Sequence, residues 1–204
     1  MKILIGTPIH EIKDYSMEKW LESVSKFDYP ADLLMVDNSP SINYVKRVRG
    51  YCKKYGINNY KLIHINVNQD SILDERLSQS REVIRQEILT KEYDAWCSIE
   101  CDVIAPPNAI TKLVDLIRRY WMVSHVYPSR VYSNKNNAEF GIALIKRRAL
   151  EKLGFLKGYG NIDPLEPTCW YGNDVWFIKQ LDDKSNGKRR VVHEKIYPIY
   201  HLNK

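Results

Sequence analysis

Short apolar segments alternate with helical patterns along the first 121 residues, and this alternation is what most limits how the chain can fold. The apolar segments predict strands, and the stretches between them carry apolar residues at helical spacing. Four strand-then-helix pairs in succession favour an α/β fold with a mostly parallel central sheet flanked by helices. The expected strands are 2–6, 33–36, 60–65 and 95–103, and the expected helices are 14–27, 43–55, 71–91 and 106–121.

The remaining residues have a different texture. Two further strands, 122–127 and 140–146, are separated by a polar loop rich in asparagine. Short helices at 147–153 and 173–181 and a strand at 190–197 follow, with a loop containing glycine and proline at 158–171. Neither an internal repeat nor a linker composition is visible, so we expect one domain over residues 1–204 with a smaller mixed C-terminal part.

Composition limits the class of protein. The chain has 204 residues, 44% of them hydrophobic, which is enough to build a sizeable core. Its longest purely apolar runs are four to six residues, far short of a membrane span, and the N-terminus lacks the apolar region of a signal peptide. We therefore expect a cytoplasmic protein. The net charge of +6 leaves nucleic acid, acidic lipid surfaces and phosphorylated small molecules open as partners.

The cysteines predict neither a zinc site nor a structural disulfide. Cys52, Cys97, Cys101 and Cys169 contain no C-x-x-C pair. On a continuous strand, Cys97 and Cys101 lie roughly 13 Å apart, which excludes a disulfide or a shared metal between them unless the strand breaks. Free buried thiols in a reducing compartment are the expectation.

The strand expected at 95–103 carries the most informative polar pattern. Its odd positions are all apolar, and its even positions include Glu100 and Asp102. A period of two puts both carboxylates on one face, roughly 7 Å apart. They also lie at the carboxyl end of the strand, where parallel α/β sheets bind ligands. Two such carboxylates suit Mg²⁺ or Mn²⁺ with a diphosphate, although they could also simply face solvent at a strand boundary.

Arg81 falls within the apolar stripe of the helix expected at 71–91. That stripe consists of Leu73, Leu77, Ile84 and Ile88, and Arg81 lies only about 40° from Leu77 around the helix. A guanidinium facing the core needs a carboxylate or phosphate partner. Arg81 is therefore expected to contact a nucleotide or the two carboxylates, unless it snorkels at the edge of the stripe.

The segment Ile99-Glu100-Cys101-Asp102-Val103, followed by Ala105-Pro106-Pro107, resembles the D-x-D region of GT-A-fold nucleotide-sugar glycosyltransferases. It is most similar to glycosyltransferase family two, with glutamate in place of the first aspartate. Four further segments are similar to the family's motifs in the same order. They are Gly6-Thr7-Pro8, Val36-Asp37-Asn38-Ser39, the stretch from Phe140 to Arg147 with Gly154-Phe155, and the stretch from Gly172 to Phe177.

This resemblance implies a GT-A-like, Rossmann-like domain with a nucleotide-binding half (1–121) and an acceptor-side half (122–204). It implies metal-dependent transfer of a sugar from a UDP- or GDP-sugar to an acceptor hydroxyl, with inversion. Asp174 would be the catalytic base, because Asn173 replaces the family's usual glutamate. The implied nucleotide-sugar site is Thr7, Pro8, Asp37, Arg81, Glu100 and Asp102, and the implied ligands of Mn²⁺ or Mg²⁺ are Glu100, Asp102 and His201.

Three of these residues also have plain structural interpretations. Asp37 could be an ordinary Asx-turn residue, and Asp174 could stabilise a helix N-terminus through the macrodipole. His201 could be a surface histidine near the end of the sequence.

Other functions fit the sequence less well. A nucleotidyltransferase acting on sugar phosphates usually opens with a glycine-rich loop containing Arg or Lys, and Gly6–His10 has one glycine and neither residue. A nucleic-acid-binding module needs a continuous basic stripe, whereas the basic clusters at 46–49, 118–119, 146–148 and 184–190 are dispersed. A non-catalytic relative of the family is a third alternative.

The acceptor of the transferase would be a glycan, a lipid-linked molecule or a protein. The basic segment 184–190 could touch an anionic acceptor or a membrane surface.

Overall fold

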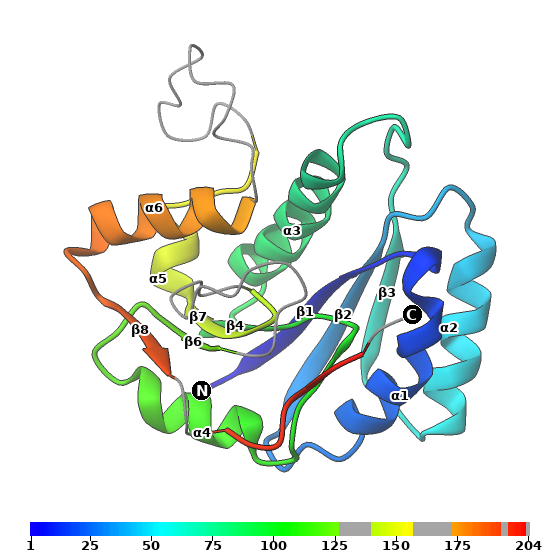
Figure 1. Ribbon diagram of the computed structural model, residues 1–204, viewed down its shortest axis with the longest axis horizontal. Coiled ribbons are helices and arrows are strands. Elements are labelled where there is room, and N and C mark those ends of the chain that lie inside the picture. Colours follow the sequence, from blue (N-terminus) through cyan, green and yellow to red (C-terminus); the bar gives the residue numbers. More distant parts are fainter. Residues whose placement is uncertain (127–139, 157–172, 193–195, 203–204) are drawn as a thin grey trace.

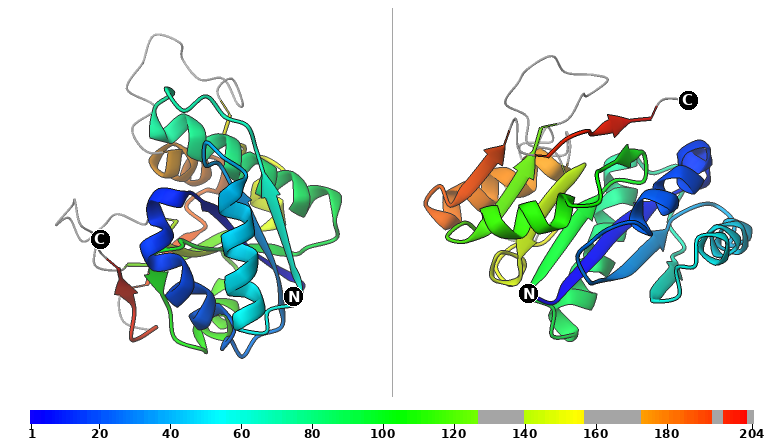
Figure 2. Two further views of the ribbon diagram at one scale, coloured as in Figure 1. Left: turned by 90° about the vertical axis from the view of Figure 1, so that its right-hand side faces the viewer. Right: turned by 90° about the horizontal axis from the view of Figure 1, so that it is seen from below.

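The chain folds around a seven-stranded sheet with helices on both faces (Figures 1 and 2). This computed structural model describes residues 1–126, 140–156, 173–192 and 196–202. The strands of the main sheet are β1 (Ile3–Ile9), β2 (Ala31–Asp37), β3 (Tyr60–His64), β4 (Ala95–Ile99), β6 (Met122–His125), β7 (Ile142–Lys146) and β8 (Arg189–Val192). The helices are η1 (Glu11–Lys13), α1 (Asp14–Val24), α2 (Asn43–Lys54), α3 (Leu73–Thr90), α4 (Ala109–Ile117), α5 (Arg147–Leu150) and α6 (Asn173–Ser185).

The sheet has the order β3-β2-β1-β4-β7-β6-β8 and is mostly parallel, as the sequence predicted. Strands β3, β2, β1 and β4 pair in parallel, and β6 pairs in parallel with β8. Within the described residues, β7 alone runs against the other strands, between β4 and β6. The chain thus places β2 on one side of β1 and β4 on the other. This reversal of strand order beside β1 is where open α/β sheets bind ligands.

Alternating side chains of the strands supply two cores, one on each face of the sheet. Ile3 and Ile5 of β1 pack with α1, α2 and α4, whereas Leu4 packs with α3, α5 and α6. Each fully buried aliphatic side chain stabilises the fold by about 1.5–3 kcal/mol relative to an exposed one. The helices are therefore fixed on the sheet by the period-two pattern of the strands.

Gly6 lets α3 lie unusually close to β1. A Cβ atom at this position would lie 2.8 Å from Nε1 of Trp96, and closer still to Cγ2 of Ile84. The Trp96 indole N–H also donates to the Gly6 carbonyl at 2.9 Å. This glycine therefore sets the position of the helix that carries Arg81, one turn before Ile84.

A second, two-stranded sheet brings the end of the described chain back to β4. It pairs β5 (Val103–Ile104) with β9 (Tyr200–His201), and β9 is the red strand in Figure 1. The pairing aligns Val103 with His201, and the Leu202 N–H donates to the Asp102 carbonyl at 2.8 Å. As a result, His201 lies beside Asp102 although ninety-nine positions separate them.

Two local expectations about these elements were wrong. The helix expected from residue 71 begins at Leu73, whose side chain is 60% exposed rather than part of the core stripe. The strand expected to continue to Val103 ends at Ile99, and a tight turn follows it. Every helix in the described part of the chain is too short or too polar to span a lipid bilayer.

Candidate functional site

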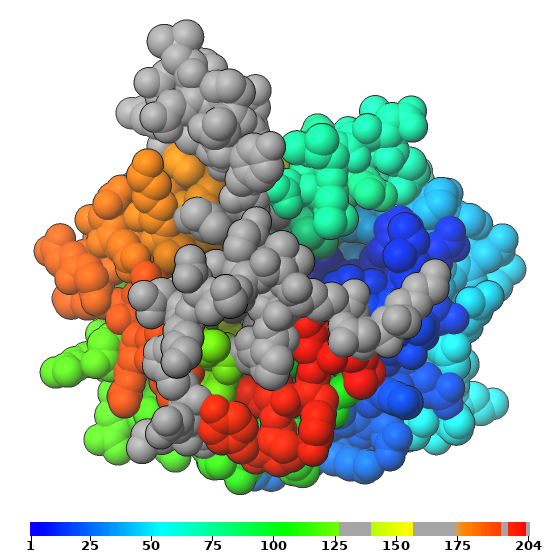
Figure 3. Space-filling model, viewed as in Figure 1, coloured from blue at the N-terminus to red at the C-terminus, as the bar shows by residue number. Residues whose placement is uncertain are grey.

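A pocket of about 280 Å³ opens at the carboxyl ends of β1 and β4, beside the point where strand order reverses. Figure 3 shows the hollow between α3 (teal) and the segment containing β1 and η1 (blue). Its lining comes from β1 and η1 (Pro8, Ile9, His10, Ile12, Lys13), the end of β2 (Asn38), α3 (Leu73, Arg76, Leu77, Arg81) and the end of β4 (Ser98, Glu100, Cys101). Of the residues expected in the site, Pro8, Arg81 and Glu100 line this pocket.

The turn after β4 separates the two carboxylates that the strand pattern placed on one face. The Val103 N–H donates to the Glu100 carbonyl at 2.9 Å, which reverses the chain within four residues. Glu100 then approaches Arg81, whereas Asp102 approaches Lys13 and His201. The expectation of a continuous strand with both carboxylates side by side is therefore corrected to a turn that sends them to different partners.

Arg81 is buried at the base of the site and joins two of the expected residues. Its side chain is 2% exposed, so the snorkelling alternative is excluded. Its guanidinium is ion-paired with Asp174 at the start of α6 and lies 3.6 Å from Oε1 of Glu100. The second Asp174 oxygen accepts the Phe140 N–H at 3.2 Å. The structure thus brings Arg81, Glu100 and Asp174 together.

An aromatic cluster supports this arrangement. The Arg81 guanidinium lies 4.7 Å from the centre of the Phe140 ring, a cation–π distance. Phe140 also makes edge-to-face contacts with Trp96, Phe155 and Phe177, and Phe155 stacks on Phe177 at 4.7 Å. Because Phe177 lies one turn after Asp174, the cluster fixes the start of α6 against β4 and β7.

Asp102 is a buried carboxylate with two neighbours that can carry positive charge. It is 2% exposed, and its Oδ2 lies 2.9 Å from Nζ of Lys13 and 3.3 Å from Nε2 of His201. Its Oδ1 has no hydrogen-bond partner among the described residues. Burial alone would lower the pKa of Lys13, but the negative charges of the Cys101 thiolate that forms at high pH and of the Glu100 and Asp102 carboxylates outweigh burial and raise that pKa above its ordinary value.

For the pKa of Glu100, in contrast, burial outweighs the effect of the neighbouring positive charges. Burial raises the pKa of its carboxyl group, and the nearby Asp174 and Asp102 carboxylates add to this effect. Lys13 and Arg81 lower the same pKa but do not overcome burial. The proton on Glu100 is therefore held more tightly than on an ordinary glutamate.

The expected metal ligands are only partly assembled. In the described part of the chain, no three His, Cys, Asp or Glu side chains meet as a metal-binding group. Asp102 and His201 are adjacent, whereas Glu100 is turned towards Arg81. The unpartnered, buried Oδ1 of Asp102 is nevertheless the kind of hard oxygen that Mg²⁺ and Mn²⁺ prefer, so the donors fit such an ion.

Thr7 and Asp37 lie behind the pocket rather than on its surface. The Thr7 side chain is fully buried. Asp37 is also fully buried, and its Oδ1 accepts the Ser39 N–H at 3.1 Å and the Ser39 hydroxyl at 2.6 Å, as in an Asx turn. Its Oδ2 lies 2.8 Å from Nδ1 of His64. Asp37 therefore organises the loop after β2, and its neighbour Asn38 reaches the pocket.

Sequence reasoning missed five polar residues of the pocket, namely His10, Lys13, Asn38, Arg76 and Ser98. Each lies at or just after the carboxyl end of a parallel strand, or in the first turns of α3, which was the available signal. The segments that follow β1 and β2 and the first turns of α3 are widely separated in sequence, so only the strand order brings these residues together.

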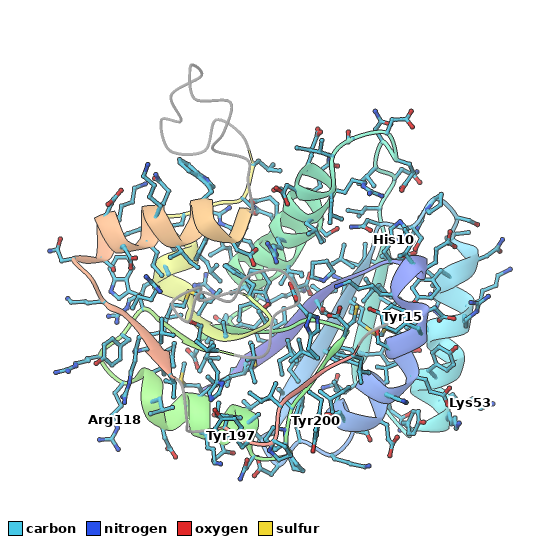
Figure 4. All side chains as sticks on the ribbon, in the orientation of Figure 1. His10, Tyr15, Lys53, Arg118, Tyr197 and Tyr200 are labelled. Carbon is cyan, nitrogen blue, oxygen red and sulfur yellow. The ribbon has the colours of Figure 1, made fainter. Side chains whose placement is uncertain are left out.

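Three of the basic clusters that were expected to be dispersed meet on one surface, which corrects that expectation. The Trp121 N–H donates to the Lys188 carbonyl at 2.7 Å, and the Arg148 guanidinium donates to the Tyr120 carbonyl at 3.0 Å. This surface, formed by residues 118–121, 146–152 and 184–190, lies at the end of the molecule opposite the pocket, as Arg118 and His10 show in Figure 4. The surplus charge is therefore not concentrated at the candidate site.

No protein-family model matches the chain, and a search of curated proteins gives no match. Among solved structures, the mannosyltransferase PcManGT from Pyrobaculum calidifontis, in complex with GDP-Man and Mn²⁺, superposes with a TM-score of 0.69 at 14% identity. That match covers 95% of this chain and 56% of PcManGT.

Two other solved structures have the same layout. S. aureus TarS 1-349 in complex with UDP has a TM-score of 0.64 at 12% identity, covering 97% of this chain and 59% of that one. A nucleoside-diphosphate-sugar pyrophosphorylase from Vibrio cholerae has a TM-score of 0.60 at 10% identity, and the match covers 95% of this chain and 93% of that one. This chain thus spans a little over half the length of the two glycosyltransferases. The fold of the chain is that of the GT-A-type nucleotide-sugar glycosyltransferases.

Proposed function

We propose that this chain transfers a sugar from a nucleotide-sugar donor to an acceptor hydroxyl. The observation that carries this proposal is the buried Arg81 guanidinium at the edge of the pocket, which links Glu100 at the end of β4 to Asp174 at the start of α6. In this proposal Glu100 serves the donor and Asp174 serves the acceptor. A reaction between two bound substrates needs such a junction between two binding regions. The likeness to structures that contain GDP-Man and UDP supports the same donor class for this chain.

The pocket offers the positive groups that a diphosphate requires. Lys13, Arg76 and Arg81 all line it. The Nε atoms of both arginines, and Nε2 of His10, are buried without hydrogen-bond partners among the described residues. An anionic ligand would satisfy such nitrogens. Pro8 would contact the nucleotide directly, whereas Thr7 and Asp37 would act by holding the loops after β1 and β2.

Asp102 and His201, with Glu100, would hold Mn²⁺ or Mg²⁺. The bound ion would neutralise the negative charge that develops on the leaving nucleoside diphosphate. Asp102 is the central ligand in this proposal, because its Oδ1 is buried and unpartnered among the described residues.

Asp174 would act as the general base. The acceptor oxygen forms a bond to the anomeric carbon, the bond from that carbon to the diphosphate breaks, and the acceptor proton passes to Asp174. Attack from the side opposite the diphosphate inverts the anomeric centre. Arg81 and the Phe140 N–H orient the Asp174 carboxylate, which keeps further lone pairs for the acceptor hydroxyl.

A donor-cleavage assay tests this function. Release of nucleoside diphosphate from a panel of UDP- and GDP-sugars is measured in Mn²⁺ with wild type, Asp102→Asn and Asp174→Asn. Asp182→Asn is the matched control, because Asp182 is also on α6 but pairs with Arg189 away from the pocket. Asp174→Asn should lose at least about a hundredfold in rate, the usual contribution of a general base. Asp102→Asn should lose activity because it removes the central ligand of the metal ion. Unchanged turnover in Asp102→Asn would contradict the metal assignment.

Nucleotidyl transfer to sugar phosphates is the second candidate. The likeness to the Vibrio cholerae pyrophosphorylase, which covers 93% of that protein, favours it, whereas the sequence Gly6-Thr7-Pro8-Ile9-His10 speaks against it. Incubation with a nucleoside triphosphate and a sugar 1-phosphate distinguishes the two, since only a nucleotidyltransferase releases pyrophosphate. A non-catalytic relative would bind nucleotide-sugars without turning them over.

The basic surface opposite the pocket is proposed to contact an anionic membrane surface. Its charges come from residues 118–119, 146–152 and 184–190, and Arg190 lies over the Tyr120 ring at 5.8 Å. Sedimentation with anionic vesicles, compared with neutral vesicles, tests this contact. Binding to RNA or DNA with a steep dependence on salt would instead favour a nucleic-acid partner.

A further inference from the structure

The positively charged Lys13 ammonium group contacts Asp102, the carboxylate that is proposed to bind the metal ion. It lies at the end of η1, directly after β1, and its Nζ is 2.9 Å from Oδ2 of Asp102. His201 approaches the same oxygen at 3.3 Å. The ammonium group therefore contacts Oδ2 of the same carboxylate whose buried Oδ1 would hold the metal ion.

Asp102 needs a cation in this setting. Its side chain is 2% exposed, and burial of an unpaired carboxylate costs several kcal/mol. Arg81, the buried cation of the site, is turned to Glu100 and Asp174. The Lys13 ammonium, 2.9 Å from Oδ2, is thus the group that balances Asp102.

We propose that Lys13 and a divalent metal ion are alternative cations for Asp102, so that metal binding requires the Lys13 ammonium to leave this carboxylate. The proposal rests on the metal site of the proposed function and adds a residue that controls its occupancy. A divalent ion on Asp102 would lie within a few ångströms of the ammonium, where like charges repel strongly. One buried carboxylate balances only part of their combined charge.

The pocket gives the displaced ammonium a place to go. The Lys13 side chain is 41% exposed and lines the pocket, whereas Asp102 does not line it. Its flexible four-carbon stem lets the ammonium turn from Asp102 towards the cavity. A nucleoside diphosphate bound there is an anion that would attract it. Lys13 thereby couples the two ligands, because the diphosphate removes the competitor of the metal ion.

Mn²⁺ binding in the absence of nucleotide tests this proposal directly. The dissociation constant is measured by calorimetry, and by the electron paramagnetic resonance signal of free Mn²⁺, for wild type, Lys13→Met and Lys19→Met. Lys19 is an exposed lysine of α1 and serves as the matched control. Lys13→Met should bind Mn²⁺ at least about tenfold more tightly than wild type, a difference of about 1.4 kcal/mol. Lys19→Met should match wild type.

Two further variants locate the ion and control for folding. Adding Asp102→Asn to Lys13→Met should abolish the gain, and Lys13→Arg, which keeps the charge, should bind Mn²⁺ as weakly as wild type. Equal Mn²⁺ affinity in wild type and Lys13→Met, including no binding by either, would overturn the proposal. A gain that persists without Asp102 would overturn it too. Because no nucleotide is present, these results are independent of the donor-cleavage assay, which tests the proposed function.

Discussion

Arg81 of α3 forms a buried ion pair with Asp174, the second residue of α6, and the same guanidinium lies 3.6 Å from Glu100 at the end of β4. One side chain thus connects the helix after β3 with an element ninety-three positions later in the sequence. The Arg81 guanidinium also lies over the Phe140 ring, so its position is fixed by packing as well as by charge. This contact makes a single site from two distant parts of the chain.

Replacing Arg81 should destabilise the fold as well as the site. Arg81→Met removes the cation between the Asp174 and Glu100 carboxylates, and loss of one partner of a buried ion pair costs about 3–5 kcal/mol. Urea unfolding followed by circular dichroism measures this loss. Arg81→Lys keeps the charge but not the forked geometry, so its loss should be smaller. An unfolding free energy within error of wild type for Arg81→Met would show that the ion pair does not hold α6.

Gly6 should tolerate no side chain. The added Cβ of Gly6→Ala would press on Ile84 and on Nε1 of Trp96, and overpacking of this kind costs about 1–3 kcal/mol. Gly50 of α2 is the matched control, because a Cβ there meets nothing within 4 Å. Gly50→Ala should stabilise its helix by about 0.5–1 kcal/mol. Thermal unfolding of the two variants should therefore shift in opposite directions, and a neutral Gly6→Ala would contradict the close approach of α3.

The raised pKa of Glu100 predicts a pH-dependent stability. As pH rises above the ordinary value of 4.5, the unfolded chain loses the Glu100 proton before the folded chain does, so this group progressively destabilises the fold. Glu100→Gln removes that effect. Its melting temperature relative to wild type should increase between about pH 4 and pH 8, which differential scanning fluorimetry measures.

Glu18 supplies a control of opposite sign. Its hydrogen bond to Lys54 lowers the pKa of Glu18, so this group stabilises the fold above pH 4.5 and loses that effect as pH falls. The melting temperature of Glu18→Gln should therefore fall slightly below that of wild type as pH rises. The same trend in both variants would mean that burial of Glu100 does not govern its titration.

The described cysteines should be unreactive in the native protein. Burial raises the pKa of Cys97 and of Cys101 to about 12, and that of Cys52 to about 11. Because the thiolate is the reactive form, iodoacetamide near neutral pH should modify these three only after unfolding. Mass spectrometry of the labelled peptides reads this out, with protein in urea as the positive control. Rapid native labelling of Cys101 would show that the turn after β4 opens.

Periodicity predicted the sheet and one residue of the site. The parallel strands appeared in sequence as short apolar runs, because both of their faces are buried. Arg81 was expected on the core side of its helix from the helical spacing alone, and it is buried there. The free, buried state expected for Cys52, Cys97 and Cys101 is confirmed, whereas Cys169 lies outside the described residues.

Other features depend on contacts that are distant in sequence. No local pattern shows that the chain turns at Glu100, because the apolar alternation continues to Val103. That turn is fixed by pairing with β9, about a hundred positions later. Lys13 likewise had no signal beyond following β1, and its role depends on where Asp102 is placed by the turn.

The most direct test of the central claim is a thermal-shift screen of nucleoside diphosphates with and without Mn²⁺. It needs no acceptor and no knowledge of the sugar. If the pocket binds the nucleotide part of a sugar donor, one nucleoside diphosphate at a hundred times its Kd should raise the melting temperature by about 5–10 °C. The rise should be larger with Mn²⁺ and should disappear in Asp102→Asn. No shift with any nucleoside diphosphate, in the presence or absence of Mn²⁺, would contradict the account.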